Sequence, residues 1–183
     1  MFFHQTKLSG VYAIDLELRQ DDRGAFARTF CKKEFAQIGF NQDFVQMNQS
    51  WNLKKGTLRG MHYQNAPFSE TKFIRVIRGA VLDIAIDIRK GSPTFLQHIA
   101  IELSEANHRC ILIPEGFAHG FITLQDNTEL IYHHTEYYAP GHEAGLRWDD
   151  DALGIDWPLT PSALSDKDLI YPYINASFEG ISI

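Results

Sequence analysis

Polar and apolar residues alternate along much of the chain, and this period of two is typical of β-strands that bury one face. The stretch KFIRVIRGAVLDIAIDIR (72–89) predicts two strands that are broken near Gly79. Shorter apolar runs predict further strands at 98–103, 110–116, 120–125 and 129–138, separated by Gly, Pro, Asn and Asp residues that favour turns. Many short strands at this spacing predict an all-β sandwich or barrel of the jelly-roll kind.

Helical patterns are few and short. CKKEFAQIG (31–39) predicts two turns that end at Gly39, and LSDKDLIYP (164–172) has the pattern of a short capped helix. The chain has 183 residues, and a chain of this length buries roughly 70% of its unfolded surface. No internal repeat, low-complexity segment or linker divides it, so we expect a single domain over residues 1–183.

Composition excludes several classes of function. The formal net charge is −6, whereas a protein that binds nucleic acid non-specifically needs a basic surface, so we expect no nucleic-acid partner. A local cluster of arginine and lysine could still hold an anionic small molecule. No apolar run is long enough to span a bilayer and the first residues lack the pattern of a secretory signal, so we expect a cytoplasmic protein without membrane contact.

The stretch LRGMHYQ (58–64) combines a strand pattern with residues suited to chemistry. Arg59 and His62 are an odd number of residues apart, so a regular strand would point them to opposite faces. Gly60 lies between them and is a natural place for a β-bulge that turns both toward one face. A lone histidine in a strand is more often structural than catalytic, so this stretch leaves the role of His62 open.

The stretch PEGFAHGF (114–121) has the spacing Pro-x-Gly-x-x-His, which resembles the second half of the cupin signature. Cupins that bind a metal complete the site with a His-x-His pair and a glutamate, but here Gln64 stands where the second imidazole would be. The adjacent pair His133 and His134 does not replace it, because neighbouring strand residues point to opposite faces. Cys31 and Cys110 give neither a disulfide framework nor a Cys-x-x-Cys metal signature. We therefore expect no metal; the absence of an organic cofactor is implied only by the family resemblance described next.

Seven blocks, in matching order over nearly the whole chain, resemble the dTDP-4-dehydrorhamnose 3,5-epimerases, a family of metal-free proteins with cupin architecture. The blocks are DDRGAF (21–26), FVQMNQS (44–50), GTLRGMHYQ (56–64), DIRKGSPTF (87–95), IPEGFAHGF (113–121), YYAPGHE (137–143) and LSDKD (164–168). The resemblance implies a cupin-like jelly roll that epimerises C3, C5 or both in a nucleotide-activated 4-keto-6-deoxy sugar. It also implies a homodimer in which an N-terminal strand pairs across the interface.

The resemblance further implies the roles of three residues. His62 would be the base that removes a proton next to the ketone, and Asp168 its carboxylate partner. From the residues alone, a helix-capping box is the better interpretation of Ser165-x-x-Asp168, and Asp166 competes for the partner role. Tyr132 would be the proton donor, although an aromatic residue in a strand more commonly packs in a core.

Residues that would contact the substrate follow from the same resemblance. Lys72 and His119 would lie near the sugar and stabilise the enolate. Arg23 and Arg59 would donate to the diphosphate, and Gln46 and Asn48 would reach the ligand from one strand face. Tyr138 would stack on the pyrimidine, and Glu143 and Lys167 match further binding positions.

The chain departs from the family pattern in a few places. Arg28 stands where a glutamate is usual, Met47 stands where an acidic or small residue is commoner, and NLKKG has one extra residue. Arg28 beside the ligand would alter which nucleotide or sugar is accepted. An enzyme of narrower or different scope, a non-catalytic cupin that binds sugar nucleotides and a metal-dependent cupin therefore remain alternatives.

Overall fold

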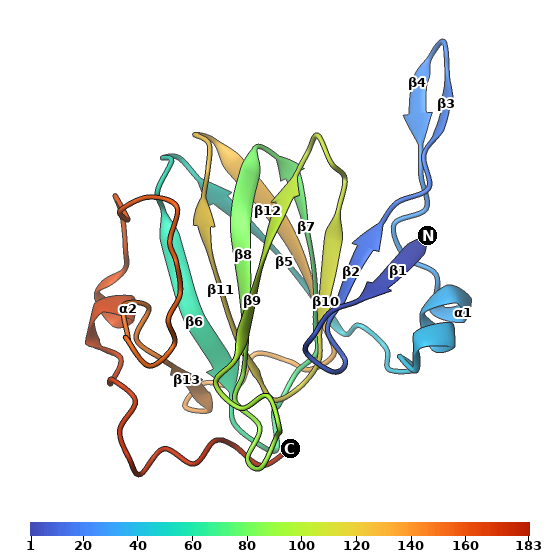
Figure 1. Cartoon of the computed structure of the whole chain (residues 1–183). Coiled ribbons are helices and arrows are strands. Elements are labelled where there is room, and N and C mark those ends of the chain that lie inside the picture. The colour runs from blue at the N-terminus through green and yellow to red at the C-terminus, as the bar shows by residue number, and fades with distance from the viewer.

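The alternating segments form two antiparallel sheets that pack face to face in the computed structural model, which describes residues 1–183 (Figure 1). The six-stranded sheet has the order β1 (Phe2–Gln5), β2 (Tyr12–Asp15), β10 (Cys110–Ile113), β7 (Lys72–Arg78), β12 (Thr128–His134) and β5 (Gln46–Asn52). The five-stranded sheet has the order β13 (Glu143–Gly145), β6 (Leu58–Gln64), β11 (Phe117–Thr123), β8 (Ala80–Asp87) and β9 (His98–Ser104). The predicted jelly-roll sandwich is thus confirmed.

Both predicted helical segments are present. Lys32–Phe35 (α1) continues into a 3₁₀ turn at Ala36–Ile38, which ends at Gly39 in a left-handed conformation. The second helix, α2 (Asp166–Ile170), begins after Ser165. Neither helix has the length or apolar character that crossing a membrane requires.

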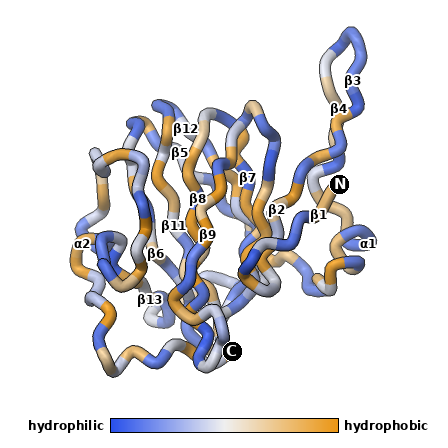
Figure 2. Tube along the Cα trace, viewed as in Figure 1, coloured by the Kyte–Doolittle hydropathy of each residue, from blue (hydrophilic) through white to orange (hydrophobic).

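Three apolar clusters fix the positions of these elements. The largest lies between the sheets and includes Ile74 and Ile111 from one sheet and Val81, Ala85 and Phe121 from the other. The outer face of the five-stranded sheet is covered by the C-terminal segment, and the outer face of the six-stranded sheet by the phenylalanine-rich segment that contains α1. Because β8 is covered on both faces, all but one of its residues are buried and six of the eight are apolar, with Asp83 and Asp87 as the polar exceptions (Figure 2).

The short hairpin of β3 (Arg19–Asp21) and β4 (Gly24–Phe26) projects away from the sandwich (Figure 1). All six of its strand residues are exposed, and Phe26 has 72% of its surface accessible. Its tip is hydrophilic (Figure 2). The hairpin therefore contributes nothing to the core of its own chain.

Candidate active site

A pocket of about 410 Å³ opens between the two sheets, at the place where their inward-facing positions change from apolar to polar. On β12, Leu130 lies in the central core, whereas Tyr132 and His134 on the same face line the pocket. On β11, Phe121 packs in the core, and His119 two residues earlier reaches the pocket. Since strand residues two apart share a face, the site is a polar continuation of the core.

Most of the predicted site residues line this one pocket. They are Gln46, Asn48, Arg59, His62, Lys72, His119, Tyr132, Tyr138, Glu143, Lys167 and Asp168. Arg23 and Arg28 do not: Arg23 pairs with Asp21 on the projecting hairpin, and Arg28 pairs with Glu34 near the N-terminus. The structure of one chain therefore does not place these two arginines where the sequence analysis expected them to act.

A β-bulge at Gly60 brings Arg59 and His62 to the same pocket, as predicted. His62 pairs with His119 and Arg59 with Phe121, so β6 has two residues where β11 has one. Gly60 has a φ of +132°, and a Cβ atom there would lie 2.5 Å from the Cα of Gly120. A side chain at Gly60 would push the two strands apart.

We expect Gly60→Ala to lower the free energy of unfolding at least about 2 kcal/mol more than Gly24→Ala does. Gly24 is the matched control, because its φ is +125° but no atom lies within 4 Å of the added Cβ. Gly24→Ala therefore measures backbone strain alone, and Gly60→Ala adds the clash with β11. Urea unfolding of both variants tests this difference. An equal decrease in the free energy of unfolding would show that the close approach of Gly60 and Gly120 does not make glycine necessary there.

His62 and Asp168 form a close pair although they come from opposite ends of the fold. The Nε2 of His62 lies 2.6 Å from the Oδ1 of Asp168, whose side chain is 2% exposed. Burial opposes ionisation of Asp168, but the bond to His62 and further donors outweigh it, so the pKa of Asp168 is lowered. An ionised carboxylate only accepts, so Nε2 carries the proton and the lone pair on Nδ1 is left as the basic site.

The capping and pairing roles of Asp168 coexist. Its backbone N–H donates to the Oγ of Ser165 at 3.1 Å, which caps α2, while its carboxylate reaches His62. Asp166, the competing carboxylate, is exposed. The helix cap therefore points the Asp168 side chain toward β6.

Tyr132 occupies the wall of the pocket opposite His62. It belongs to β12 of the six-stranded sheet, whereas His62 belongs to β6 of the five-stranded sheet. The Tyr132 hydroxyl lies 3.3 Å from the Oγ of Ser50, and burial raises the pKa of Tyr132 well above its usual value. Tyr132 consequently stays protonated and able to donate at neutral pH.

Two groups of the same pocket that could make Tyr132 a stronger acid, Lys72 and His119, have other partners. Lys72 lies 2.8 Å from the carboxylate of Glu70, and the Nε2 of His119 lies 2.9 Å from Asp83. The His119 ring packs edge-on to Tyr132, with centroids 6.3 Å apart, and the hydrogen-bond partner of the Tyr132 hydroxyl is Ser50. Burial, which the sequence could not reveal, decides the acidity of Tyr132.

Polar groups that are suited to an anionic ligand surround this pair. Arg59 uses only its Nε in a protein contact, at 2.8 Å from Asn52, which leaves its two terminal nitrogens free. Lys167 pairs with Glu143 at the rim. Tyr138 is 57% exposed there, and its backbone N–H donates to the Oε1 of Gln46.

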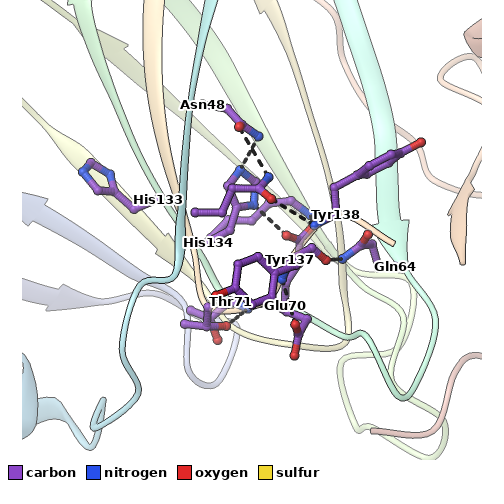
Figure 3. A network of polar contacts seen from close by, with 12 residues as sticks. Asn48, Gln64, Glu70, Thr71, His133, His134, Tyr137 and Tyr138 are labelled. Atoms are coloured by element: carbon purple, nitrogen blue, oxygen red, sulfur yellow. Dashed lines mark hydrogen bonds and ion pairs between the residues drawn. The ribbon is translucent and has the colours of Figure 1, made fainter. Parts of the chain in front are cut away.

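The structure adds pocket residues that the sequence analysis did not select. His134 and Glu70 form a buried hydrogen-bonded pair, and Tyr171 packs edge-on to the His62 ring at 5.8 Å. A signal for His134 existed, since it is two residues from Tyr132 and shares its strand face. His133 points away from the pocket, against Phe44 and Phe73, which confirms that the two histidines face opposite sides (Figure 3).

Gln64, which stands where metal-binding cupins have a second histidine, holds two loops in place. Its amide nitrogen donates to the backbone oxygens of Phe68 and Tyr137, and its oxygen accepts from the backbone N–H of Ala139. No three His, Cys, Asp or Glu side chains gather in an arrangement that would hold a metal ion.

A double-sheet sandwich with a histidine–carboxylate pair facing a protonated tyrosine defines an enzyme of the cupin architecture that moves protons on a polar ligand. The geometry of the pocket and the order of the motifs agree with one such family. The chain belongs to the dTDP-4-dehydrorhamnose 3,5-epimerase family, whose model matches residues 5–176.

Individual relatives support this assignment. The dTDP-4-dehydrorhamnose 3,5-epimerase of Shigella flexneri is 41% identical over 166 residues, which cover 90% of this chain and 91% of the relative. The dTDP-6-deoxy-D-glucose-3,5-epimerase of Legionella pneumophila, solved with dTDP-4-keto-L-rhamnose, superposes with a TM-score of 0.92 at 37% identity, covering 100% of this chain and 98% of that one. A 3′-monoepimerase of Streptomyces bikiniensis, solved with dTDP-quinovose, has a TM-score of 0.86 at 31% identity, covering 93% and 86%.

Proposed function

We propose that this protein inverts C3 and C5 of dTDP-4-dehydro-6-deoxyglucose to give dTDP-4-dehydrorhamnose. The observation that carries the proposal is the position of His62 and Tyr132 on opposite walls of one pocket. Inversion needs a base on one face of the sugar and an acid on the other. Binding alone needs neither, so this arrangement favours an enzyme over a non-catalytic binding protein.

In the proposed reaction, the Nδ1 of His62 removes the proton from the carbon next to the C4 ketone. The C–H electron pair moves into an enolate, and Tyr132 gives a proton to the opposite face of the same carbon. This leaves an imidazolium and a tyrosinate, which return to their starting states by releasing and taking up one proton each. Asp168 stabilises the imidazolium by accepting from its Nε2.

Lys72 and His119 are proposed to stabilise the enolate oxygen. Both are buried in the same pocket, one on each sheet, and each is held by a carboxylate. A fixed cation or N–H group in a buried site stabilises a developing negative charge strongly, because it need not reorganise during the reaction.

The nucleotide part is proposed to bind at the rim. Arg59 would donate its free terminal nitrogens to the diphosphate, and Tyr138 would stack on the pyrimidine. Gln46 and Asn48 line the pocket from β5, and Glu143 and Lys167 frame its edge from β13 and α2.

We further propose a homodimer in which the projecting hairpin of one copy reaches the pocket of the other. Arg23 has 90% of its side chain exposed and Phe26 lies beside it on the same hairpin, so both are accessible to a partner. This arrangement would bring Arg23 to the ligand of the second copy. Arg28 follows the same hairpin in the chain, so the segment that leads to Arg28 would approach that ligand as well. Sedimentation equilibrium tests the dimer, and a monomer at micromolar concentration would contradict it.

The deciding experiment is incubation with dTDP-4-dehydro-6-deoxyglucose in deuterated water, followed by NMR at C3 and C5. We expect deuterium at both carbons and accumulation of the inverted sugar. No exchange at either carbon, with other 4-keto sugar nucleotides equally inert, would overturn the proposal.

A second candidate is inversion of a single centre. Two observations support this candidate: the chain is similar to the 3′-monoepimerase of Streptomyces bikiniensis, and Arg28 stands where the family usually has a glutamate. The same spectra distinguish the candidates, because an enzyme of narrower scope would exchange one carbon only. Metal analysis of the purified protein tests the metal-dependent alternative.

A further inference from the structure

A buried carboxylate, Glu70, lines the pocket between two basic groups, Lys72 and His134. Figure 3 shows Glu70 beside His134. One oxygen of Glu70 lies 2.8 Å from the Nζ of Lys72, and the other lies 2.6 Å from the Nδ1 of His134. The three side chains are each about nine-tenths buried, with exposures of 10%, 10% and 9% for Glu70, Lys72 and His134. None of these contacts is needed for the proton transfers described above.

The charge on Glu70 determines which nitrogen of His134 carries its proton. Burial opposes ionisation, but Lys72 and His134 outweigh it and hold the pKa of Glu70 at about 2. An ionised carboxylate is an acceptor only, so the Nδ1 of His134 must be the donor in this pair. In the neutral imidazole the Nε2 is then an acceptor.

The protonation of His134 also sets the direction of the hydrogen bonds that lead from it to Tyr138 at the rim of the pocket. Asn48 lies 3.3 Å from the Nε2 of His134, and an acceptor at Nε2 requires the amide nitrogen of Asn48 on that side. The Oδ1 of Asn48 then accepts from the Nε2 of Gln46 at 3.4 Å, and the Oε1 of Gln46 accepts from the backbone N–H of Tyr138 at 3.1 Å. One buried carboxylate thus orients two amides and the loop that carries Tyr138.

We propose that Glu70 and His134 are positioning residues, which orient the Asn48 and Gln46 amides and hold Lys72 in place for the substrate. This inference rests on the proposed function, because it assigns the oriented groups to binding of the sugar nucleotide. His134 also stacks on Tyr132, with centroids 6.1 Å apart and planes inclined by 19°, so the same ring supports the proposed proton donor.

The test is a double-variant cycle on His134 and Asn48, followed by the deuterium-exchange reaction. His134→Phe keeps a ring against Tyr132 and removes both hydrogen bonds. We expect it to lower kcat/KM about tenfold, chiefly by raising KM, since it disorders binding groups and leaves His62 in place. Asn48→Ala should have a similar effect, and the double variant should lie within about twofold of the worse single variant, because the two changes break one chain of contacts.

Two further variants separate positioning from a general loss of structure. His134→Gln places an amide oxygen near the former Nε2 and should recover part of the lost kcat/KM, which mere packing would not predict. Arg59→Met removes a binding group bonded to Asn52 and not to His134, so its effect should multiply with that of His134→Phe.

Multiplicative losses for His134 and Asn48, or no recovery with His134→Gln, would overturn the inference. Thermal unfolding of each variant identifies any that fail to fold, and Glu70→Gln then replaces His134→Phe in the cycle. If the parent protein itself exchanges no deuterium, the proposed function fails instead, so the two failures are distinguishable.

Discussion

His62→Asn is expected to abolish deuterium exchange at both sugar carbons while the protein still binds dTDP. The substitution removes the basic Nδ1 lone pair that the bond to Asp168 leaves free, but it removes no group assigned to the nucleotide. Loss of a general base typically lowers the rate about 10²- to 10⁴-fold. NMR exchange rates and calorimetric titration with dTDP measure the two effects on the same preparation.

A surface histidine supplies the control for this experiment. His108 is exposed and has a φ of +53°, a backbone conformation that asparagine tolerates well, so His108→Asn should fold and exchange at the parent rate. Near-parent exchange by His62→Asn would assign the base to another residue. Parallel loss of exchange and dTDP binding would instead indicate that His62 is structural.

Tyr132→Phe is expected to separate exchange from inversion. The phenyl ring can still pack against His119 and His134, and only the hydroxyl near Ser50 is lost. Deuterium should still enter from the His62 face, because proton removal and return there need no donor on the far wall. Formation of the inverted sugar should slow far more than exchange, by about 10²-fold or more. The ratio of inversion to exchange, from one NMR sample, measures this.

Tyr171→Phe is the matched control, since Tyr171 lines the pocket on the His62 side and packs against that ring. Its loss of a hydroxyl should leave the ratio of inversion to exchange unchanged. An unchanged ratio in Tyr132→Phe as well would mean that Tyr132 only packs, and that water or another side chain supplies the far-face proton.

The fold was predictable because its signals are local. Alternation on β7 and β8, turn residues after most strands and the glycine that ends the first helical segment each act within a few residues. Some errors are at strand ends: β11 begins at Phe117, earlier than the predicted 120, and β12 ends at His134, earlier than 138. Contacts across the sheet decide these ends, and an isolated segment does not contain them. Other errors are whole strands that the pattern did not predict, among them the β3–β4 hairpin and β13.

Much of the site was also predictable, through the resemblance and the shared strand faces. The bulge at Gly60 was inferred from one glycine, and the opposite orientations of His133 and His134 from period two. Glu70 could not be found in this way, because its partners come from β7 and β12 and no pattern marks a carboxylate in a loop. The raised pKa of Tyr132 depends on burial between two sheets, which a sequence does not display.

The bond between His62 and Asp168 joins residues that are 106 positions apart, and it has a consequence for biogenesis. Most strands of both sheets leave the ribosome before α2 is synthesised. A nascent or truncated chain can therefore form the apolar core between its sheets and still lack the carboxylate that orients the imidazole. Contacts between distant segments form slowly, so in refolding the recovery of turnover should report when the C-terminal segment docks. Catalytic activity is therefore expected only after the C-terminal segment has been synthesised and has docked.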